Sequence, residues 1–308
     1  MSFEQILQLV QTGAELGMIT GLTVLALFLS YSMLNVCDLS TDGCFTLGAA
    51  VGAMVAVSGH PWLSLGAALA AGMVSGLVTA LLQTRLGINS LLAGIIVNTG
   101  LYSVNIAVMG GSSQVNIGKN ATVFTLAKDL LKDSVLSGQY KLLVILVFVA
   151  AGILFLSLFL RTRLGLAIRA TGDNPDMVRS SSINPVFTIT VGLCISNAFT
   201  ALSGCLLAQY QKSSNIDIGG GMVTVALASL LIGGVFFGKR RVPVRAVGAV
   251  TGAVIFRLIY TVALRLNMPA FMLRAVSAAI VAAAIAGPYL KKRGAEMMKH
   301  ARAGKGAR

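Results

Sequence analysis

The chain has 308 residues, of which 56% are hydrophobic and 11% are charged, whereas roughly a quarter of the residues in an ordinary soluble domain are charged. This composition excludes nearly all water-soluble enzymes, and the high hydrophobicity also excludes a disordered chain. The net charge of +14 would suggest a nucleic acid partner in a soluble protein, but the basic residues here lie between long apolar segments. We therefore expect an all-α, polytopic membrane protein that is surrounded by lipid and has no nucleic acid partner.

About 20 predominantly apolar residues span a bilayer, and this rule predicts nine transmembrane segments. They cover about residues 16–34, 43–58, 61–83, 90–109, 140–160, 185–209, 222–238, 246–264 and 271–290. The second and seventh segments are short and contain glycine, so each could be a broken or re-entrant helix. Residues 1–290 are thus expected to form a single membrane domain, followed by a basic tail at residues 291–308.

Lysine and arginine are more frequent in cytoplasmic loops than in external ones. The loops on one side of the predicted spans, together with the C-terminal tail, hold sixteen of these residues, and the loops on the other side hold five. This bias predicts an external N-terminus and a cytoplasmic C-terminus. Residues 35–42, which contain two Asp and no basic residue, are then expected to be a cytoplasmic loop.

Two segments of the chain are faintly similar to each other, which indicates an internal repeat. The sequence Asn35-Val-Cys-Asp-Leu-Ser-Thr-Asp-Gly-Cys-Phe-Thr46 is echoed by Asn215-Ile-Asp-Ile-Gly-Gly-Gly-Met-Val-Thr224, and each joins a long span to a short one. Two units of opposite topology would cover about residues 16–109 and 185–290, with the span at 140–160 as a linker. Inverted repeats with interrupted helices are typical of transporters and place the substrate near the bilayer midplane. Chance similarity between apolar segments is the alternative.

Polar side chains form stripes on two predicted spans, where they either join helices by hydrogen bonds or line a permeation path. The candidates for a substrate pathway are Asn98, Tyr102 and Asn105 in the fourth span and Ser196, Asn197 and Thr200 in the sixth. Arg257 lies inside the eighth span, where an unpaired charge is costly, so its planar guanidinium is a candidate to bind a substrate carboxylate. Snorkelling of the side chain toward the membrane surface, or a structural ion pair, is an equally good interpretation of Arg257.

The sequence lacks the motifs of hydrolases, metalloproteases and ATP-binding loops, and no Asp or Glu falls inside the nine predicted spans. We therefore expect no catalytic residues, no metal site and no cofactor in this chain, with energy supplied by another protein. The lack of carboxylates argues against a stand-alone secondary transporter, which together with a channel is the main alternative class.

The longest predicted cytoplasmic loop covers residues 161–184. Asp173 or Asn174 can cap a helix whose first turn holds Pro175. We predict a short amphipathic helix along the membrane face, with Met177 and Val178 available for contact. A solvated connection whose arginines only set the topology is the alternative.

Three runs resemble the permease subunits of ABC importers in the branched-chain amino acid and ribose permease group, within the branch linked to amino acids, including aromatic ones. They are Asp38-Leu-Ser-Thr-Asp-Gly-Cys-Phe-Thr-Leu-Gly-Ala49, Leu166-Ala-Ile-Arg-Ala-Thr-Gly-Asp-Asn-Pro-Asp-Met177 and Ala201-Leu-Ser-Gly-Cys-Leu-Leu-Ala-Gln-Tyr210. The resemblance implies import of a small solute, such as an amino acid, across the bacterial inner membrane. It also implies a homodimer or close heterodimer of permease subunits, two cytoplasmic ATPase subunits that bind ATP and Mg²⁺, and an extracytoplasmic substrate-binding protein.

The resemblance further implies that residues 165–184 form a coupling helix that docks in a groove of the ATPase. The matching positions are Arg169, Ala170, Thr171, Gly172, Asp173, Asn174, Pro175, Asp176, Met177 and Arg179. Two departures stand out, because residues 180–184 lack the Ala and Gly usual after this helix, and Gly233-Gly234 stands where this branch often has an acidic residue.

Overall fold

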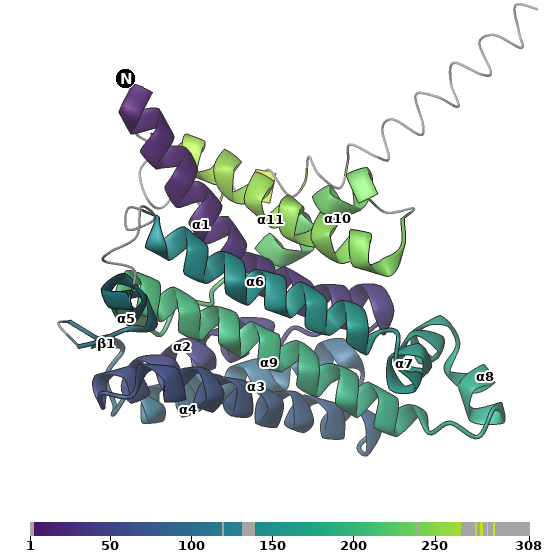
Figure 1. The fold of residues 1–308 in the computed structure, drawn as a ribbon. Coiled ribbons are helices and arrows are strands. Elements are labelled where there is room, and N and C mark those ends of the chain that lie inside the picture. Colours follow the sequence, from purple (N-terminus) through teal and green to yellow (C-terminus); the bar gives the residue numbers. More distant parts are fainter. Residues whose placement is uncertain are drawn as a thin grey trace, which may run out of the picture.

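The computed structural model describes residues 3–118, 120–130, 139–237 and 240–265, together with five isolated helical residues beyond them, and the helices form an elongated bundle (Figure 1). The helices are α1 (Phe3–Leu27), its π-helical continuation η1 (Phe28–Met33), α2 (Thr41–Val57), α3 (Pro61–Thr84), α4 (Ser90–Val108), α5 (Val123–Leu130), α6 (Tyr140–Phe159), α7 (Arg163–Asp173), α8 (Pro175–Ser180), α9 (Pro185–Gln211), α10 (Met222–Phe237) and α11 (Val242–Arg265). Strands β1 (Gln114–Asn116) and β2 (Ser213–Asn215) pair antiparallel.

Helices occupy eight of the nine predicted spans, whereas most of the ninth and the basic tail lie outside the described residues. Within the described part of the chain, six helices are long and apolar enough to cross a membrane. The predicted short second and seventh segments are α2 and α10, with 17 and 16 residues. These findings confirm an all-α, polytopic membrane fold. The short helix α5 and the β1–β2 ribbon were not predicted from the sequence.

Helix α9 lies at the centre of the bundle, with α2 and α3 on one side and α1 and α6 on the other (Figure 1). Glycine residues let the backbone of α9 approach those of α2 and α3 closely. A Cβ atom on Gly48 would overlap the carbonyl of Ala201, and one on Gly204 would overlap that of Phe45. A Cβ atom on Gly76 would meet the Leu193 carbonyl in the same way. Because lipid is as apolar as a side chain, such close backbone approach is what holds helices together in a membrane.

The segment between η1 and α2, predicted to be a cytoplasmic loop, is exposed at Asn35 and enters the bundle at Asp38 and Ser40, which are buried. The side of the membrane on which it lies stays a prediction. Asp38 is 1% exposed, and one carboxylate oxygen accepts hydrogen bonds from the backbone N–H and hydroxyl of Ser40, at 2.8 and 2.6 Å. The other oxygen accepts a bond of 2.7 Å from Nδ2 of Asn197 in the middle of α9. A buried carboxylate needs such donors, and Asn197 supplies one that lies far away in the sequence.

The prediction that no carboxylate lies within a span was wrong, because α1 begins at Phe3 and its apolar stretch runs from Leu7 to Met33. Glu15 falls inside this stretch and is 3% exposed. Its carboxylate accepts hydrogen bonds from the hydroxyl of Tyr210 at 2.7 Å and from Nε2 of Gln11 at 3.0 Å. These donors explain how the helix tolerates the carboxylate.

The helices of the two predicted repeat units pack against each other reciprocally. Helix α1 is the first helix of its unit, and it packs along α11, the third helix of the other unit. Likewise, α9 is the first helix of the second unit, and it packs along α3, the third helix of the first. The two short helices α2 and α10 each follow a break and begin close together. This arrangement is what two inverted units would produce, and the repeat itself stays a prediction.

Replacing Asn197 by Leu should lower the free energy of unfolding by at least about 2 kcal/mol, because Asp38 stays buried and loses a donor to its charge. Thermal unfolding of the purified protein in detergent measures this loss. The control is Ser103→Leu on an exposed face of α4, which should change the stability little. An equal effect of both variants would contradict the role assigned to Asn197.

Candidate functional site

Two cavities lie on either side of the turn at residues 216–221, which connects β2 to α10. The α4 cavity, of about 330 Å³, lies between this turn, α2 and α4. The Arg257 cavity, of about 770 Å³, lies between the turn, α1, α9 and α11. Asp217 and Gly220 line both cavities, so this turn is the wall that the two share.

The polar stripe predicted on the fourth span lines the α4 cavity. Asn98, Tyr102 and Asn105 all contribute to its wall, opposite Asp42 and Asp217. The amide of Asn105 donates to the backbone carbonyl at position 43 at 3.1 Å, and its Oδ1 is buried without a hydrogen-bond partner in the described structure. The stripe therefore lines a cavity and also contacts α2, through the hydrogen bond of Asn105, and passage of a solute along it stays a prediction.

The stripe predicted on the sixth span is used to join helices. The hydroxyl of Ser196 donates to the Ala26 carbonyl at 2.8 Å, and the hydroxyl of Thr200 donates to the Ser196 carbonyl one turn earlier at 3.2 Å. Asn197 binds Asp38, as described above. All three side chains are buried, and none of them lines either cavity. Interhelical hydrogen bonding, the alternative left open by the sequence, describes the contact of Ser196, whereas Thr200 bonds within α9 and Asn197 bonds to the segment between η1 and α2.

Arg257 faces the larger cavity. Its guanidinium carbon lies 5.2 Å from the centroid of the Tyr260 ring, and its Nε is buried with no hydrogen-bond partner among the described residues. Asp217, Thr20 and Gln211 also line the cavity. A cation inside an apolar bundle needs an opposite charge or hydrogen-bond acceptors nearby, and an anion that enters this cavity would supply them. Two parallel N–H···O bonds from a guanidinium suit a carboxylate.

The wall between the cavities is fixed by Asp42 in the first turn of α2. Its carboxylate accepts hydrogen bonds from the backbone N–H groups of Gly221 at 2.9 Å and Val223 at 2.7 Å, at the start of α10. The backbone N–H of Gly219 donates to Oγ1 of Thr46 at 3.2 Å. Sequence reasoning did not select Asp42 or Asp217 as site residues. The signal was present, since both lie in the two segments that echo each other.

The predicted coupling segment folds into two helices rather than one. Asn174 has extended backbone angles, and its side chain accepts from the backbone N–H groups of Asp176 and Met177 at 3.0 and 3.1 Å. Pro175 takes the first position of α8. A helical conformation is sterically disfavoured for the residue before a proline, here Asn174, so the helix is interrupted at this point. After α8, Ser182 adopts a φ of +61°, a conformation that favours glycine.

Helices α7 and α8 lie at the end of the bundle opposite α5 and the β1–β2 ribbon (Figure 1). The side chains exposed there are those of Asp173, Asn174, Pro175, Asp176, Met177 and Arg179, whereas Arg169 and Ala170 are half-buried. Val178, predicted to be available for contact, is 1% exposed because it packs into the bundle.

The inner face of α7 contacts the bundle through two residues that were predicted to meet a partner. The hydroxyl of Thr171 lies 2.8 Å from that of Thr188 in α9. A Cβ atom on Gly172 would overlap the carbonyl of Met33 and the backbone of Leu34. Thus α7 rests directly on the end of η1.

Replacing Asp42 by Ala should remove both hydrogen bonds to the start of α10 and cost about 2 kcal/mol, the upper end of measured capping effects. Amide hydrogen exchange of residues 216–225, followed by mass spectrometry, should then become faster. Asp176→Ala removes an exposed carboxylate elsewhere and is the control. Unchanged exchange at the turn in Asp42→Ala would contradict the proposed fixation of the wall.

Comparison with known proteins gives a consistent result. Residues 9–285 match the family model described as a branched-chain amino acid transport system permease component. A tyrosine transport system permease protein of Clostridioides difficile is 31% identical over 272 residues, which cover 88% of each chain. A galactose/methyl galactoside import permease protein of Haemophilus influenzae is 28% identical over 197 residues, 63% of this chain and 56% of that one. No solved structure matches the chain.

Proposed function

The chain belongs to the permease components of branched-chain amino acid transport systems, and on this premise we propose that it is the membrane subunit of an ATP-driven importer of an amino acid or a related small solute. The observation that carries the choice of solute is the cavity of about 770 Å³, into which faces Arg257, whose buried Nε has no hydrogen-bond partner in the part of the chain that the structure describes. Its size falls within the range of about 300–1,000 Å³ that is typical of small-molecule sites.

An amino acid carries one negative and one positive group, and the Arg257 cavity offers a partner for each. The guanidinium of Arg257 would bind the carboxylate, and the carboxylate of Asp217 lines the same cavity and would bind the ammonium group. Tyr260, next to the guanidinium, adds an aromatic face for the side chain of the solute. The C. difficile relative is named for tyrosine, which agrees with a solute of this class.

The energy would come from ATP hydrolysed with Mg²⁺ by separate cytoplasmic ATPase subunits, since the sequence has no ATP-binding loop. The exposed surface of α8, centred on Met177, would be their docking site. The α7–α8 end would then be cytoplasmic, and the ribbon end, with the N-terminus, would face the extracytoplasmic binding protein. A second permease subunit would complete the assembly.

A continuous set of contacts leads from the docking site to the cavities. Gly172 in α7 rests on Met33 at the end of η1, and the chain then runs directly to Asp38, which Asn197 holds. The next turn carries Asp42, which binds the wall between the cavities. A single π-helical turn such as η1 is frequent at functional sites. Movement of α7 would therefore reach the wall through covalent connections and hydrogen bonds.

A stand-alone proton-coupled carrier would need a carboxylate that exchanges protons during transport. The two buried candidates, Glu15 and Asp38, each accept hydrogen bonds from donors on fixed helices. Neither lines the α4 cavity or the Arg257 cavity, and Asp42, which does line the α4 cavity, accepts hydrogen bonds from the backbone N–H groups of Gly221 and Val223. Asp217 is exposed at the shared wall, so the choice of the ATP-driven subunit over this alternative rests on the match to the permease family.

Replacing Arg257 by Gln should reduce uptake of tyrosine or leucine into proteoliposomes that contain the complete importer by at least about tenfold, because a charged hydrogen bond contributes about 1.5–3 kcal/mol. Arg257→Lys should be intermediate, since lysine keeps the charge but loses the planar fork. Arg161→Gln, at an exposed position, is the control. Unchanged uptake by an assembled Arg257→Gln importer would refute the assignment.

Asp173→Arg should abolish transport and release the ATPase, while the permease still inserts and folds. Asp173 is exposed, and the cap of α8 is made by Asn174, so charge reversal alters the docking surface and leaves the fold intact. Co-purification with the ATPase measures the effect. Gln114→Arg places the same charge on the exposed ribbon at the opposite end and should retain the ATPase. Retention by both variants would place the docking site elsewhere.

A further inference from the structure

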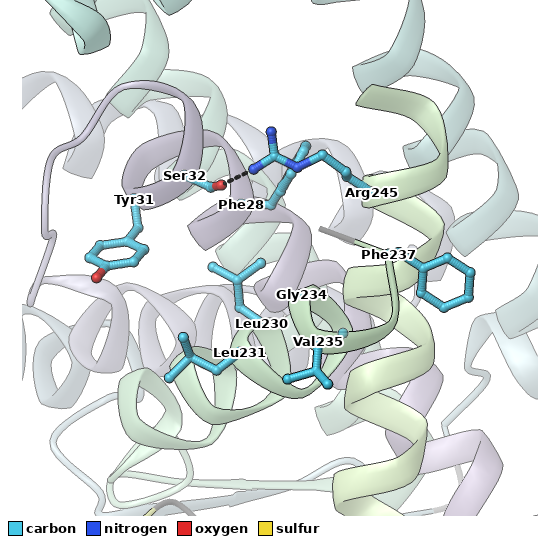
Figure 2. A pocket seen from close by; sticks show the side chains of 10 residues that line it. Phe28, Tyr31, Ser32, Leu230, Leu231, Gly234, Val235, Phe237 and Arg245 are labelled. Carbon is cyan, nitrogen blue, oxygen red and sulfur yellow. Dashed lines mark hydrogen bonds between the residues drawn. The ribbon is translucent and has the colours of Figure 1, made fainter. Parts of the chain in front are cut away.

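A third cavity, of about 390 Å³, lies near the α7–α8 end between η1, α10 and the beginning of α11 (Figure 2). Figure 2 shows Leu230, Leu231 and Val235 of α10 below it and Arg245 of α11 above it. None of its lining residues lines the α4 cavity or the Arg257 cavity. The substrate pathway proposed above therefore does not account for it.

The walls of this cavity are apolar and continue onto the outer surface of the bundle. Leu231 and Val235 are 38% and 62% exposed, and the adjacent Phe236 is 66% exposed. Gly234 adds to the open space, because a Cβ atom placed there would meet no atom within 4 Å. On a helix at membrane depth, such a surface is covered by hydrocarbon.

The polar end of the cavity is basic. Nη2 of Arg245 donates to Oγ of Ser32 at 2.8 Å, and its guanidinium carbon lies 5.5 Å from the centroid of the Phe28 ring. Arg169 does not line the cavity, but its charge has the same sign as that of Arg245 and acts on it electrostatically. No acidic side chain is found among the lining residues that the structure describes. The polar end of the cavity thus carries the charge of Arg245, whose hydrogen-bond partner in the described part of the chain is a hydroxyl.

We propose that this cavity binds an anionic phospholipid, whose phosphate contacts Arg245 and Ser32 and whose acyl chain lies along Leu231 and Val235. Charge complementarity supports an anion, and basic pockets between transmembrane helices are known to bind anionic headgroups. The apolar walls select a lipid over a free phosphate ion, which would leave them uncovered. They also fit a lipid better than a second copy of the chain. A symmetric contact centred here would bring the arginines of two copies together.

Lipid binding is tested by placing the purified full-length chain in nanodiscs. The chain is then released from the nanodiscs, and native mass spectrometry identifies the lipid that stays bound to it. The probes are phosphatidylglycerol and phosphatidylcholine at equal amounts. We expect the chain to retain phosphatidylglycerol in preference to phosphatidylcholine, and Arg245→Gln to lower this retention about tenfold. Gly234→Phe should lower it as well, because the ring fills the space for the acyl chain while Arg245 is unchanged.

Gly100→Phe is the matched control, since a Cβ atom at this exposed position of α4 also meets no atom within 4 Å. It should retain phosphatidylglycerol like the unaltered chain. Gly234→Phe also decides the question if Arg245→Gln fails to fold. Undiminished retention in Gly234→Phe, or displacement of the lipid by millimolar inorganic phosphate, would overturn the proposal. Loss of a dimer rather than of lipid in Gly234→Phe would assign the face to a second copy and would also overturn it.

Discussion

The carboxylate of Asp38 is the group on which the arrangement of the bundle depends, because a buried charge must find donors on fixed elements. Two donors come from Ser40 in its own turn, and the third comes from Asn197 in the central helix. This contact holds the break after η1 inside the bundle. It also sets the first turn of α2, from which Asp42 binds the start of α10. The two helix breaks therefore meet at one polar centre, and both cavities of the candidate pathway lie beside it.

Local features of the fold could be predicted from the sequence. Long apolar stretches mark the spans because the bilayer sets their length, and Asn174 followed by Pro175 marks the start of α8 because capping depends on neighbouring residues. The burial of Asp38 and Glu15 could not be predicted in this way. Their donors, Asn197 and Tyr210, lie 159 and 195 residues away, and only the folded bundle brings them together.

In the candidate site, too, some features could be predicted from the sequence and others could not. The stripes on α4 and α9 have similar spacing in the sequence, yet Asn98 and Tyr102 line a cavity, whereas Ser196 binds a neighbouring helix. Spacing identifies a polar face, but the neighbouring helix decides what that face meets. Arg257 could be selected because a charge inside a span is rare for energetic reasons. The echoing segments mark the turn that holds Asp217, but only the fold places this turn beside α11.

The contacts of α9 differ in what they permit mechanically. Toward α2 and α3 the backbones touch at Gly48 and Gly76, so these three helices interlock and would move as one block. Toward α1 the contact combines apolar side chains with the hydroxyl groups of Ser196 and Ser203 on backbone carbonyls, and such bonds can pass to another carbonyl when two helices slide. A shear movement would run along this seam. The Arg257 cavity has walls on both sides of it, so its volume would change with each displacement.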